Sequence, residues 1–405
     1  MNTNDKSKSF LKNSGLLPQE EVLEIQNSRK SFSVGVPKEN TGIEARVPLA
    51  PLAVKALVEI GFNIFLESGF AKGANFNDLE YSECGANITE NKSEIFRCDI
   101  IIKVQPLTID EINSLKGNQI IITSLHANMQ SKEYYLKLMH KKITAIAFDT
   151  LQDSHGRNPI VRSMSEIAGR SSILIAAEYL SNVHGGKGEM LGGVTGVSPS
   201  EVVIIGAGTA GMNAAKTAHS LGALVKVFDN SIYNLENLQK YVGSKLFTST
   251  IHTKILTNAL KTADVAVGAI KIINQKANIC VSEEMVKQMK DNSIIIDICI
   301  DQGGCFETSK ATDHKKSVYK KHGVIHYCVP NIASRVARTA SYSISNILTN
   351  ELIKFNNSGS LNNFLKFYPG VRVGVYIFNG ILTNEHIGNI HSLFTKDIDL
   401  LLAAL

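Results

Sequence analysis

The sequence predicts an α/β protein made of two Rossmann-like, doubly wound parallel-sheet domains that a cleft separates. Short apolar runs alternate with helical patterns along most of the chain, which is typical of parallel sheets covered by helices on both faces. A glycine-rich turn directly follows one of these runs near the middle of the chain. The chain has 405 residues, more than a single hydrophobic core normally supports, so two domains are expected.

The first domain is predicted to begin at residue 32. Its expected strands cover residues 34–37, 63–67, 100–104, 119–124 and 143–149, with helices such as 52–60 and 132–141 between them. Residues 1–31 are polar and rich in lysine, and we interpret them as an N-terminal extension with a helix over 18–28. The polar stretch 151–162 marks the first domain boundary.

A long helix over 165–183 is predicted to lead into the second domain. Strands are expected there over 202–205, 224–228, 265–268, 294–298 and 324–328, and helices over 212–221, 253–261 and 283–290. The residues after 329 are too few for another α/β domain, so a helix over 338–355 should cross back and let the tail pack on the first domain. We therefore expect a discontinuous substrate and catalytic domain (32–160 and 337–405), a cofactor domain (161–336) and a hinge at each crossing.

The composition is that of an ordinary globular protein, with 44% hydrophobic and 20% charged residues. The net charge of +5 is small and the lysines are scattered among acids, so neither nucleic acid nor a membrane is an expected partner. No apolar run reaches the roughly 18 residues of a membrane span, and the N-terminus has no hydrophobic signal core. The six cysteines form no C-x-x-C pair and no His/Cys/Asp group has zinc-site spacing, so we predict free thiols, a cytoplasmic location and no metal.

The glycine-rich turn has the full context of a dinucleotide-binding fingerprint. The apolar run 202–205 leads into Gly206, Ala207, Gly208, Thr209, Ala210 and Gly211, a helical segment follows, and the next apolar run ends in Asp229. The first glycine permits the tight turn, the second lets backbone N–H groups approach a pyrophosphate, and the third lets helix pack on strand. Asp229 is suited to accept hydrogen bonds from a ribose and to repel a 2′-phosphate, which favours NAD over NADP. The alternative is a glycine-rich turn that binds no nucleotide.

Polar residues just after strand ends are the candidates for chemistry, because ligands bind beyond the carboxyl ends of parallel strands. His126 closes the run 120–125 and suits proton transfer, while Asp301 stands before two glycines. Arg46 lies in a polar loop after the first strand, where it can hold a carboxylate bidentately. Lys103 and Gln105 are two residues apart in a predicted strand and should face the same side. The alternatives are a structural strand-end residue for His126, a helix cap or turn acid for Asp301, and a solvated loop charge for Arg46. A lysine in so apolar a run as that of Lys103 needs a partner.

Four stretches together resemble the alanine dehydrogenases, the family that also contains the α subunit of proton-translocating NAD(P) transhydrogenase. They are residues 35–47, 164–170, 206–211 and 297–304, and the resemblance extends from residue 34 to about 350. The sequence Ile-Asp-Gln-Gly-Gly at 300–304 favours the dehydrogenase branch. The resemblance implies oxidative deamination of L-alanine to pyruvate and ammonia with NAD, and the reverse amination. It also implies a homo-oligomer, a hexamer in this family.

The same resemblance implies roles for individual residues. Arg46 matches the arginine that binds the substrate carboxylate, His126 the general acid/base, and Asp301 the catalytic aspartate beside the nicotinamide. Four further residues match positions that contact the cofactor or line the cleft: Ser165, Asp229, Ile270 and Asn331. Asn331 is also expected to contact the substrate.

The chain departs from the family at one informative place. Family dehydrogenases usually carry Lys-Val-Lys-Glu-Pro, with the second lysine on the substrate, where this chain has Lys103, Val104, Gln105 and Pro106. A glutamine donates a hydrogen bond without a charge, a difference of about 1–2 kcal/mol, or roughly tenfold in affinity. Lys103 is expected to compensate in part. A second departure replaces the usual Val-Pro-Gly loop at 272–274.

Three other functions stay open at this stage. The Gln105 change is compatible with an NAD-dependent dehydrogenase of another amino or imino acid on the same scaffold. The fold is also compatible with an NAD(H)-binding module like the transhydrogenase α subunit. A regulatory NAD-binding protein without catalysis is the third alternative.

Overall fold

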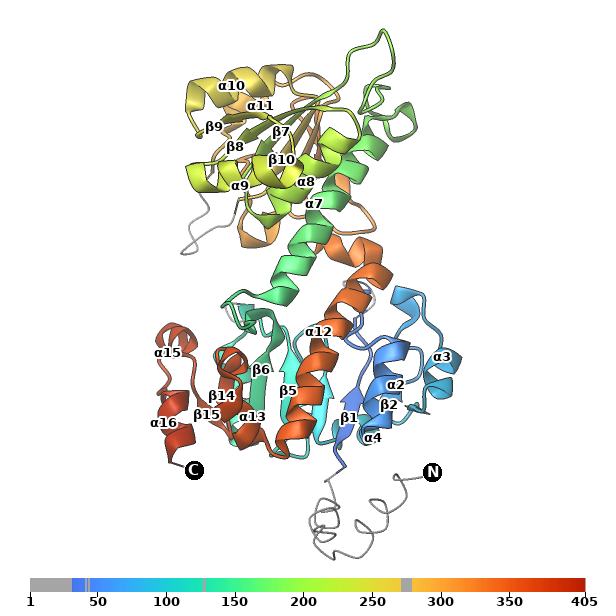
Figure 1. The fold of residues 1–405 in the computed structure, drawn as a ribbon, viewed down its shortest axis with the longest axis vertical. Helices are drawn as coiled ribbons and strands as arrows, with labels where there is room; N and C mark the ends of the chain where they lie inside the picture. Colours follow the sequence, from blue (N-terminus) through green and yellow to red (C-terminus); the bar gives the residue numbers. More distant parts are fainter. Residues whose placement is uncertain (1–30, 41, 43, 127–128, 271–278, 405) are drawn as a thin grey trace, which may run out of the picture.

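The protein forms two lobes, each built on one β-sheet, joined by the long helices α7 (Pro159–Leu180) and α12 (Ala337–Ser358) (Figure 1). The computed structural model describes residues 31–40, 42, 44–126, 129–270 and 279–404. The helix predicted over 18–28 and the departure at 272–274 lie outside the described residues. Within these ranges no helix is both long and apolar enough to cross a membrane.

The first lobe contains an eight-stranded sheet in the order β3-β2-β1-β4-β5-β6-β14-β15. Six strands are parallel to one another: β1 (Ser33–Val36), β2 (Asn63–Glu67), β3 (Asn87–Thr89), β4 (Ile100–Ile102), β5 (Ile120–Thr123) and β6 (Thr144–Ala147). The tail adds β14 (Val375–Phe378) antiparallel to β6, and then β15 (Ile381–Leu382). The helices of this lobe are α2 (Pro51–Glu59), α3 (Asp78–Glu83), α4 (Lys92–Phe96), α5 (Ile109–Ser114), α6 (Lys132–His140), α13 (Leu361–Phe367), α14 (Pro369–Arg372), α15 (Glu385–His391) and α16 (Ile398–Ala403).

The second lobe contains a seven-stranded sheet in the order β12-β13-β11-β10-β7-β8-β9. Its parallel strands are β7 (Glu201–Ile205), β8 (Leu224–Phe228), β9 (Phe247–Ser249), β10 (Val265–Gly268), β11 (Ile294–Asp297) and β13 (Val324–Tyr327). The edge strand β12 (Val318–Lys321) runs antiparallel to β13. The helices are α8 (Thr209–Ser220), α9 (Ile232–Val242), α10 (Thr253–Thr262) and α11 (Glu283–Val286).

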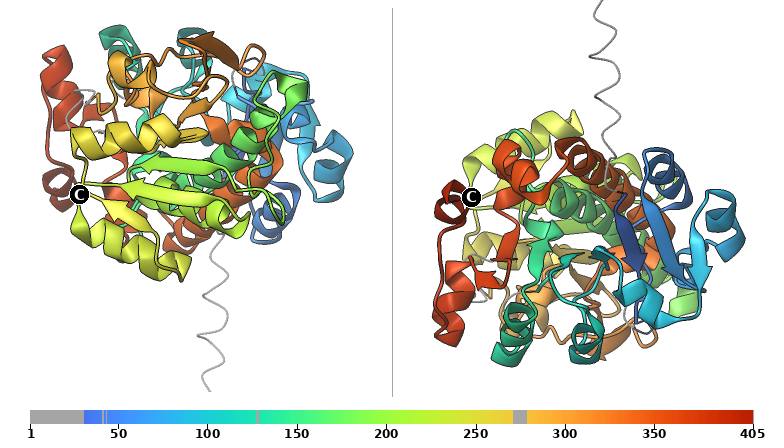
Figure 2. Two further views of the ribbon diagram at one scale, coloured as in Figure 1. Left: turned by 90° about the horizontal axis from the view of Figure 1, so that it is seen from above. Right: turned by 90° about the horizontal axis from the view of Figure 1, so that it is seen from below.

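Each sheet is buried on both faces, which explains why its strands are continuous apolar runs rather than alternating ones. Successive residues of β7 enter opposite cores: Val202 and Ile204 pack in the core beneath α7 and α8, and Val203 and Ile205 in the core beneath α10 and α11. In the first lobe the neighbours Ile100 and Ile101 are divided in the same way. The views from above and below show helices flanking the sheets (Figure 2). The predicted fold class is confirmed, with antiparallel strands at the sheet edges as an addition.

Three sequence predictions were wrong in detail. The helix expected from 165 begins at Pro159, because proline at the first helical position needs no N–H partner. It therefore includes residues 159–162, the end of the polar stretch that we interpreted as a boundary. The helix expected over 283–290 ends at Val286. Strand β4 ends at Ile102, so Lys103 and Gln105 lie beyond it and the alternation of strand side chains does not place them on one face.

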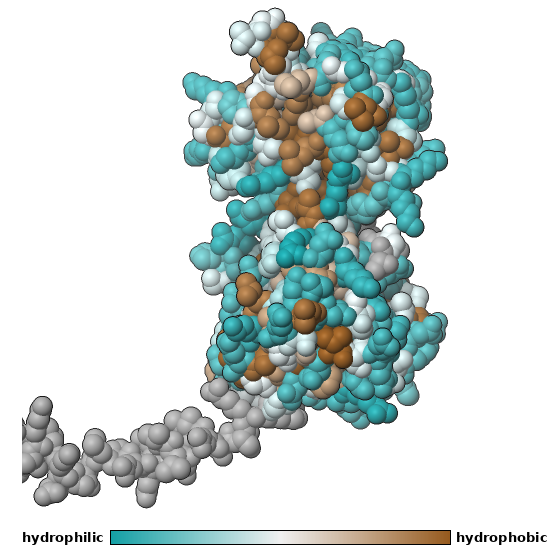
Figure 3. Space-filling model, turned by 90° about the vertical axis from the view of Figure 1, so that its right-hand side faces the viewer, coloured by the Kyte–Doolittle hydropathy of each residue, from teal (hydrophilic) through white to brown (hydrophobic). Residues whose placement is uncertain are grey.

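Large apolar side chains are exposed around the end of α7 and the loop that follows it. Leu174, Val183, Met190, Val194 and Val197 are each more than half exposed, with Val183 at 87%. The space-filling view shows apolar side chains gathered on the upper lobe (Figure 3). Such a group of apolar side chains is typical of a surface that another protein covers.

Serines at the start of α12 and just before it hold the loop that follows β1. The Ser334, Ser341 and Ser345 hydroxyls accept hydrogen bonds from the backbone N–H groups of Ala45, Val47 and Ala50, each at 2.9 Å. Ser341 also donates to the Ala337 carbonyl at 2.6 Å and is fully buried. The returning helix therefore supplies hydrogen-bond partners for a loop some 290 residues earlier in the chain.

We expect Ser341→Ala to destabilise the protein by about 1–3 kcal/mol, because it leaves the buried Val47 N–H without its partner. The measurement is chemical unfolding followed by circular dichroism. Ser343→Ala, at a half-buried position of the same helix, is the control. Equal unfolding midpoints for the two variants would contradict the role of this hydrogen bond.

Candidate active site

Both sheets share one topology, and it creates an equivalent crevice in each lobe. The strand order is β3-β2-β1-β4-β5-β6 in the first sheet and β9-β8-β7-β10-β11-β13 in the second. In each sheet the order along the chain changes direction, between β1 and β4 in the first and between β7 and β10 in the second. Loops that leave the carboxyl ends of two such strands diverge, and the crevice between them is where open α/β sheets bind ligands. The glycine turn lies at the crevice of the second lobe, and the loops with Arg46 and Gln105 lie at that of the first.

The glycine turn has the geometry that a pyrophosphate requires. Gly206 has φ +109°, and a Cβ there would lie 2.4 Å from the Ala269 carbonyl oxygen. A Cβ on Gly211 would lie 1.8 Å from the Gly206 oxygen, so α8 can approach β7 only with glycine at this position. By contrast, a Cβ on Gly208 would meet no atom within 4 Å. The open space above Gly208, at the N-terminus of α8, fits the phosphates of a dinucleotide.

Asp229 stands at the end of β8, directly beside the glycine turn. Its Oδ2 accepts a hydrogen bond from the Ala207 N–H at 2.6 Å, and its Oδ1 accepts one from the Ser231 N–H at 2.7 Å. Each carboxylate oxygen has a further lone pair, which can accept a ribose hydroxyl. The acid is thus tied to the glycine turn by backbone hydrogen bonds.

Helix α7 packs closely against the same turn. A Cβ on Gly169 would lie 2.1 Å from the Ala210 carbonyl oxygen, which explains the glycine in the 164–170 stretch. Ser165 lies one helical turn before Gly169 and so on the same face of α7. Ile270 lies on the other side of the turn, with its backbone nitrogen 2.9 Å from the position of a Cβ on Gly206.

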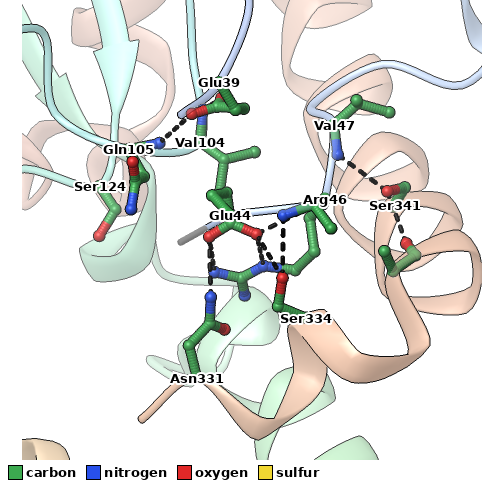
Figure 4. Close-up of polar contacts among 12 residues, drawn as sticks. Glu39, Glu44, Arg46, Val47, Val104, Gln105, Ser124, Asn331, Ser334 and Ser341 are labelled. Atoms are coloured by element: carbon green, nitrogen blue, oxygen red, sulfur yellow. Dashed lines mark hydrogen bonds and ion pairs between the residues drawn. The ribbon is translucent and has the colours of Figure 1, made fainter. Parts of the chain in front are cut away.

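Arg46 is held by a buried carboxylate that also contacts the second crossing (Figure 4). The Glu44 side chain, 1% exposed, accepts hydrogen bonds from Arg46 Nε at 2.8 Å and Nη2 at 2.7 Å. Asn331 Nδ2 donates to Glu44 at 2.8 Å and Ser334 Oγ at 3.1 Å. Burial acts to raise the pKa of Glu44, but the hydrogen bonds and charge of Arg46 outweigh it and hold that pKa below its usual value. Asn331 is therefore joined to Arg46 through Glu44.

A second buried acid, Glu39, holds the turn that carries Gln105 (Figure 4). Glu39 Oε1 accepts a hydrogen bond from the Val104 N–H at 2.5 Å, and Oε2 accepts one from the Gln105 N–H at 3.2 Å. Burial raises the pKa of Glu39 to about 8, although the charge of Lys103 and these two hydrogen bonds act in the opposite direction. Lys103 itself is buried, and its ammonium binds both carboxylate oxygens of Glu111 at 2.9 Å. The charge of Lys103 is therefore already compensated within the first lobe, and its role as a substrate ligand stays a prediction.

His126 and Gln105 line one pocket beyond β4 and β5. The pocket is lined by residues 105–109, His126, residues 129–131 and Tyr134. His126 is exposed and has a left-handed backbone, with φ +42°, a conformation that is uncommon outside glycine and is found at functional sites. Its Nε2 lies 3.4 Å from Ser124 Oγ.

Asp301 belongs to the other lobe and yet interacts with His126. Burial by the surrounding protein raises the pKa of Asp301, while the charge of His126 acts to lower it, although solvent still reaches this residue. The structure therefore brings the two predicted catalytic residues within electrostatic range of each other across the two lobes. Neither residue could be placed beside the other from the sequence, because 175 positions separate them.

The loop that carries Asp301 is held at its base by Asp297. The Asp297 carboxylate accepts hydrogen bonds from Cys299 Sγ and the Cys305 N–H at 3.1 Å and from Ser309 Oγ at 2.6 Å. Asp297, Cys299 and Cys305 place ligand-type atoms within 4.8 Å of one another, so they are close in space without zinc-type spacing in the sequence. The hydrogen bonds give this group a structural explanation as the anchor of the loop.

Sequence reasoning did not single out the two acids that organise the first crevice. Glu39 and Glu44 stand in a polar loop, where an acid is usually solvated, and only burial distinguishes them. Their proximity to Arg46 in the sequence was the available signal.

Comparison with known proteins identifies the family. The N-terminal domain model of the alanine dehydrogenase/PNT family matches residues 35–168, and the C-terminal domain model matches residues 172–385. The chain belongs to the alanine dehydrogenase/PNT family. An alanine dehydrogenase of Methanococcus maripaludis is 40% identical over 362 residues, which cover 89% of this chain and 96% of that protein. An alanine dehydrogenase of Staphylococcus saprophyticus is 37% identical over 367 residues, with 90% and 98% covered.

Solved structures of the family agree with the fold. A structure of an L-alanine dehydrogenase superposes with a TM-score of 0.84 at 33% identity, covering 89% of this chain and 99% of that one. A transhydrogenase from Sinorhizobium meliloti has a TM-score of 0.73 at 22% identity, which supports the fold alone. The resemblance that the sequence suggested is confirmed.

The raised pKa of Glu39 predicts a dependence of stability on pH. The unfolded chain loses the Glu39 proton near the ordinary pKa of 4.5 and the folded chain near 8, so stability should fall as pH rises between these values. Between pH 5 and pH 8 the free energy of unfolding of Glu39→Gln should fall less than that of the parent, by more than about 1 kcal/mol. The reason is that each unit of pKa difference between the folded and unfolded chain corresponds to about 1.4 kcal/mol. Chemical unfolding at pH 5, 6.5 and 8 measures it. Glu59→Gln, at an exposed position of α2, should keep the parent slope, and a Glu39→Gln slope equal to it would refute the prediction.

Proposed function

We propose that this protein is an NAD-dependent alanine dehydrogenase, which converts L-alanine to pyruvate and ammonia and also runs the reverse amination. The observation that carries the proposal is the approach of His126 and Asp301 from the two lobes, next to a pocket that His126 and Gln105 line. Relatives named alanine dehydrogenase that align along nearly their whole length support the same activity.

NAD is the cofactor that the second crevice fits best. The open space at Gly208 and the N-terminus of α8 suit a pyrophosphate, and Asp229 beside the turn suits an unphosphorylated ribose. We assign Ser165, Thr209, Ala210 and Ile270 to the wall of this site. A bound NAD supplies the hydride acceptor for the reaction.

Arg46 is the residue that we assign to the substrate carboxylate. Glu44 occupies its Nε and Nη2 atoms, which leaves the Nη1 side of the guanidinium for a second carboxylate. The Glu44 pairing also fixes the orientation of the planar group. Gln105 and Asn331 complete the substrate side of the proposed site, and the neutral Gln105 makes its binding of the carboxylate weaker than that of a lysine.

The chain's own groups handle the protons. Loss of the α-hydrogen leaves iminopyruvate, whose positive charge the Asp301 carboxylate stabilises. His126 takes a proton from the attacking water as the carbinolamine forms and then gives it to the nitrogen. As ammonia leaves, the carbinolamine hydroxyl passes its proton to His126 and pyruvate forms. The left-handed backbone of His126 holds the ring at the pocket for these transfers.

We propose that one lobe binds the substrate and the other binds the cofactor. Residues 32–160 and 337–405 form the substrate and catalytic part, and residues 161–336 form the cofactor part. We further propose a homo-oligomer, a hexamer by resemblance to the family, with the exposed apolar side chains around the end of α7 in its contacts. The six cysteines are free thiols, which supports a reducing, cytoplasmic location.

His126→Ala should lower kcat with L-alanine at least about 100-fold, because proton transfer loses its general acid/base. Binding of NADH, measured by its fluorescence, should stay within about twofold, since His126 lies in the other lobe. Steady-state absorbance of NADH measures turnover. An unchanged kcat would refute the assignment of His126.

Gln105→Lys should lower KM for L-alanine roughly tenfold, because a charged donor binds the carboxylate more strongly than an amide. Gln288→Lys, an exposed position of the second lobe, adds the same charge elsewhere and should leave KM unchanged. A panel of amino acids belongs to this experiment. The parent chain could have a higher kcat/KM for another amino acid than for L-alanine, and Gln105→Lys could abolish this difference. That result would mean that the protein is a dehydrogenase of the other amino acid instead.

A further inference from the structure

The side chain of Asp149 has no part in the mechanism above, although it lies beside the proposed acid/base. Asp149 belongs to a short 3-10 turn, Phe148–Thr150, which follows β6 directly. Strand β6 is the parallel neighbour of β5, and Thr123 pairs with Ala147 at their carboxyl ends. The residues after Thr123, which include Ser124 and His126, therefore emerge next to Asp149.

The environment of the Asp149 carboxyl is unusual for an acid. Its Oδ1 is buried and has no hydrogen-bond partner among the described residues. Burial raises the pKa of Asp149, and the charge of His126 and the Ser124 hydroxyl act to lower it. A buried carboxyl that is not fully satisfied is costly, which indicates that its role lies in the interaction with these two residues.

Ser124 stands between the acid and the histidine. Its side chain is buried, and Oγ lies 3.4 Å from His126 Nε2. A hydroxyl can accept from one group and donate to another at the same time. Ser124 can thus accept from Nε2–H of a neutral imidazole and donate its own proton toward the Asp149 carboxylate.

We propose that Asp149 and Ser124 are positioning residues for His126, with the Ser124 hydroxyl connecting the Asp149 carboxylate to Nε2. This connection leaves Nδ1 as the nitrogen that exchanges protons with the substrate. When Nδ1 takes up a proton, the ring becomes an imidazolium, and the negative charge of Asp149 stabilises it without receiving a proton itself. The inference rests on the proposed function in that His126 is the acid/base.

Titratable groups of three elements interact with Asp149 or His126. Asp149 acts on His126 from the turn after β6, and Asp301 acts on it from the second lobe. Tyr376 on β14 interacts with Asp149. The imidazole therefore interacts with two carboxyl groups, one in its own lobe and one in the other lobe.

The test uses the full chain with Asp149→Asn and Ser124→Ala, and Asp153→Asn as the control. Asp153 is a surface acid four residues further on that pairs with Arg157. The rate at which diethyl pyrocarbonate modifies His126, followed by peptide mass spectrometry from pH 5 to 9, reports the titration of this exposed ring without any turnover. The pH profile of kcat/KM for L-alanine is the second readout.

We expect Asp149→Asn to move the midpoint of His126 modification down by about one pH unit, because a nearby negative charge is lost. The acidic limb of kcat/KM should move in the same direction, and kcat should fall roughly tenfold or more. Ser124→Ala should move the modification midpoint and the acidic limb of kcat/KM in the same direction by a smaller amount. Asp153→Asn should leave both of these pH values unchanged. Ser124→Ala removes one hydroxyl only, so it carries the test if Asp149→Asn does not fold.

Modification curves of Asp149→Asn and Ser124→Ala that coincide with the parent curve would overturn the proposal. Absence of alanine turnover in the parent chain would instead refute the proposed function. The modification experiment would still decide whether Asp149 and Ser124 act on His126, so the two failures are distinguishable.

Discussion

The buried ion pair of Glu44 and Arg46 is the interaction on which the proposed substrate site depends. It joins the loop after β1 to Asn331 and Ser334, which lie between the second lobe and α12. A buried ion pair contributes little net stability, but loss of one partner leaves an uncompensated charge and is strongly destabilising. The pair therefore acts mainly as a constraint that fixes the guanidinium and the second crossing in one arrangement.

A buried acid also fixes the neighbouring loop, which carries Gln105. Glu39 holds the backbone at Val104 and Gln105 with a buried carboxyl group, and Lys103 is neutralised by Glu111. Charges in the first crevice are thus compensated in pairs before any substrate arrives. In the substrate site that we propose, a neutral Gln105 adds no unpaired cation to this partly buried surface and would bind a carboxylate less strongly than a lysine.

The two lobes repeat one topology and divide the chemistry between them. Each sheet changes direction at a crevice, and one crevice carries the glycine turn while the other carries Arg46 and Gln105. His126 and Asp301 extend from the carboxyl ends of β5 and β11, so each belongs to a different lobe. A change in the angle between the lobes would alter the distance between these two residues directly, which makes α7 and α12 the natural place for control of the reaction.

The sequence by itself determined the fold class, most central strands and the glycine turn, because these depend on local signals. Apolar runs define buried parallel strands, and the glycine turn is recognised by its spacing directly after one of them. A Cβ on Gly206 or Gly211 would collide with backbone atoms, whereas Gly208 faces open space. The burial of Glu39, Glu44 and Asp149, the ion pair of Lys103 and the approach of His126 to Asp301 were decided only by the tertiary structure. An acid in a polar stretch looks the same whether it is solvated or buried, and the partners that distinguish the two cases come from segments up to about 290 residues away.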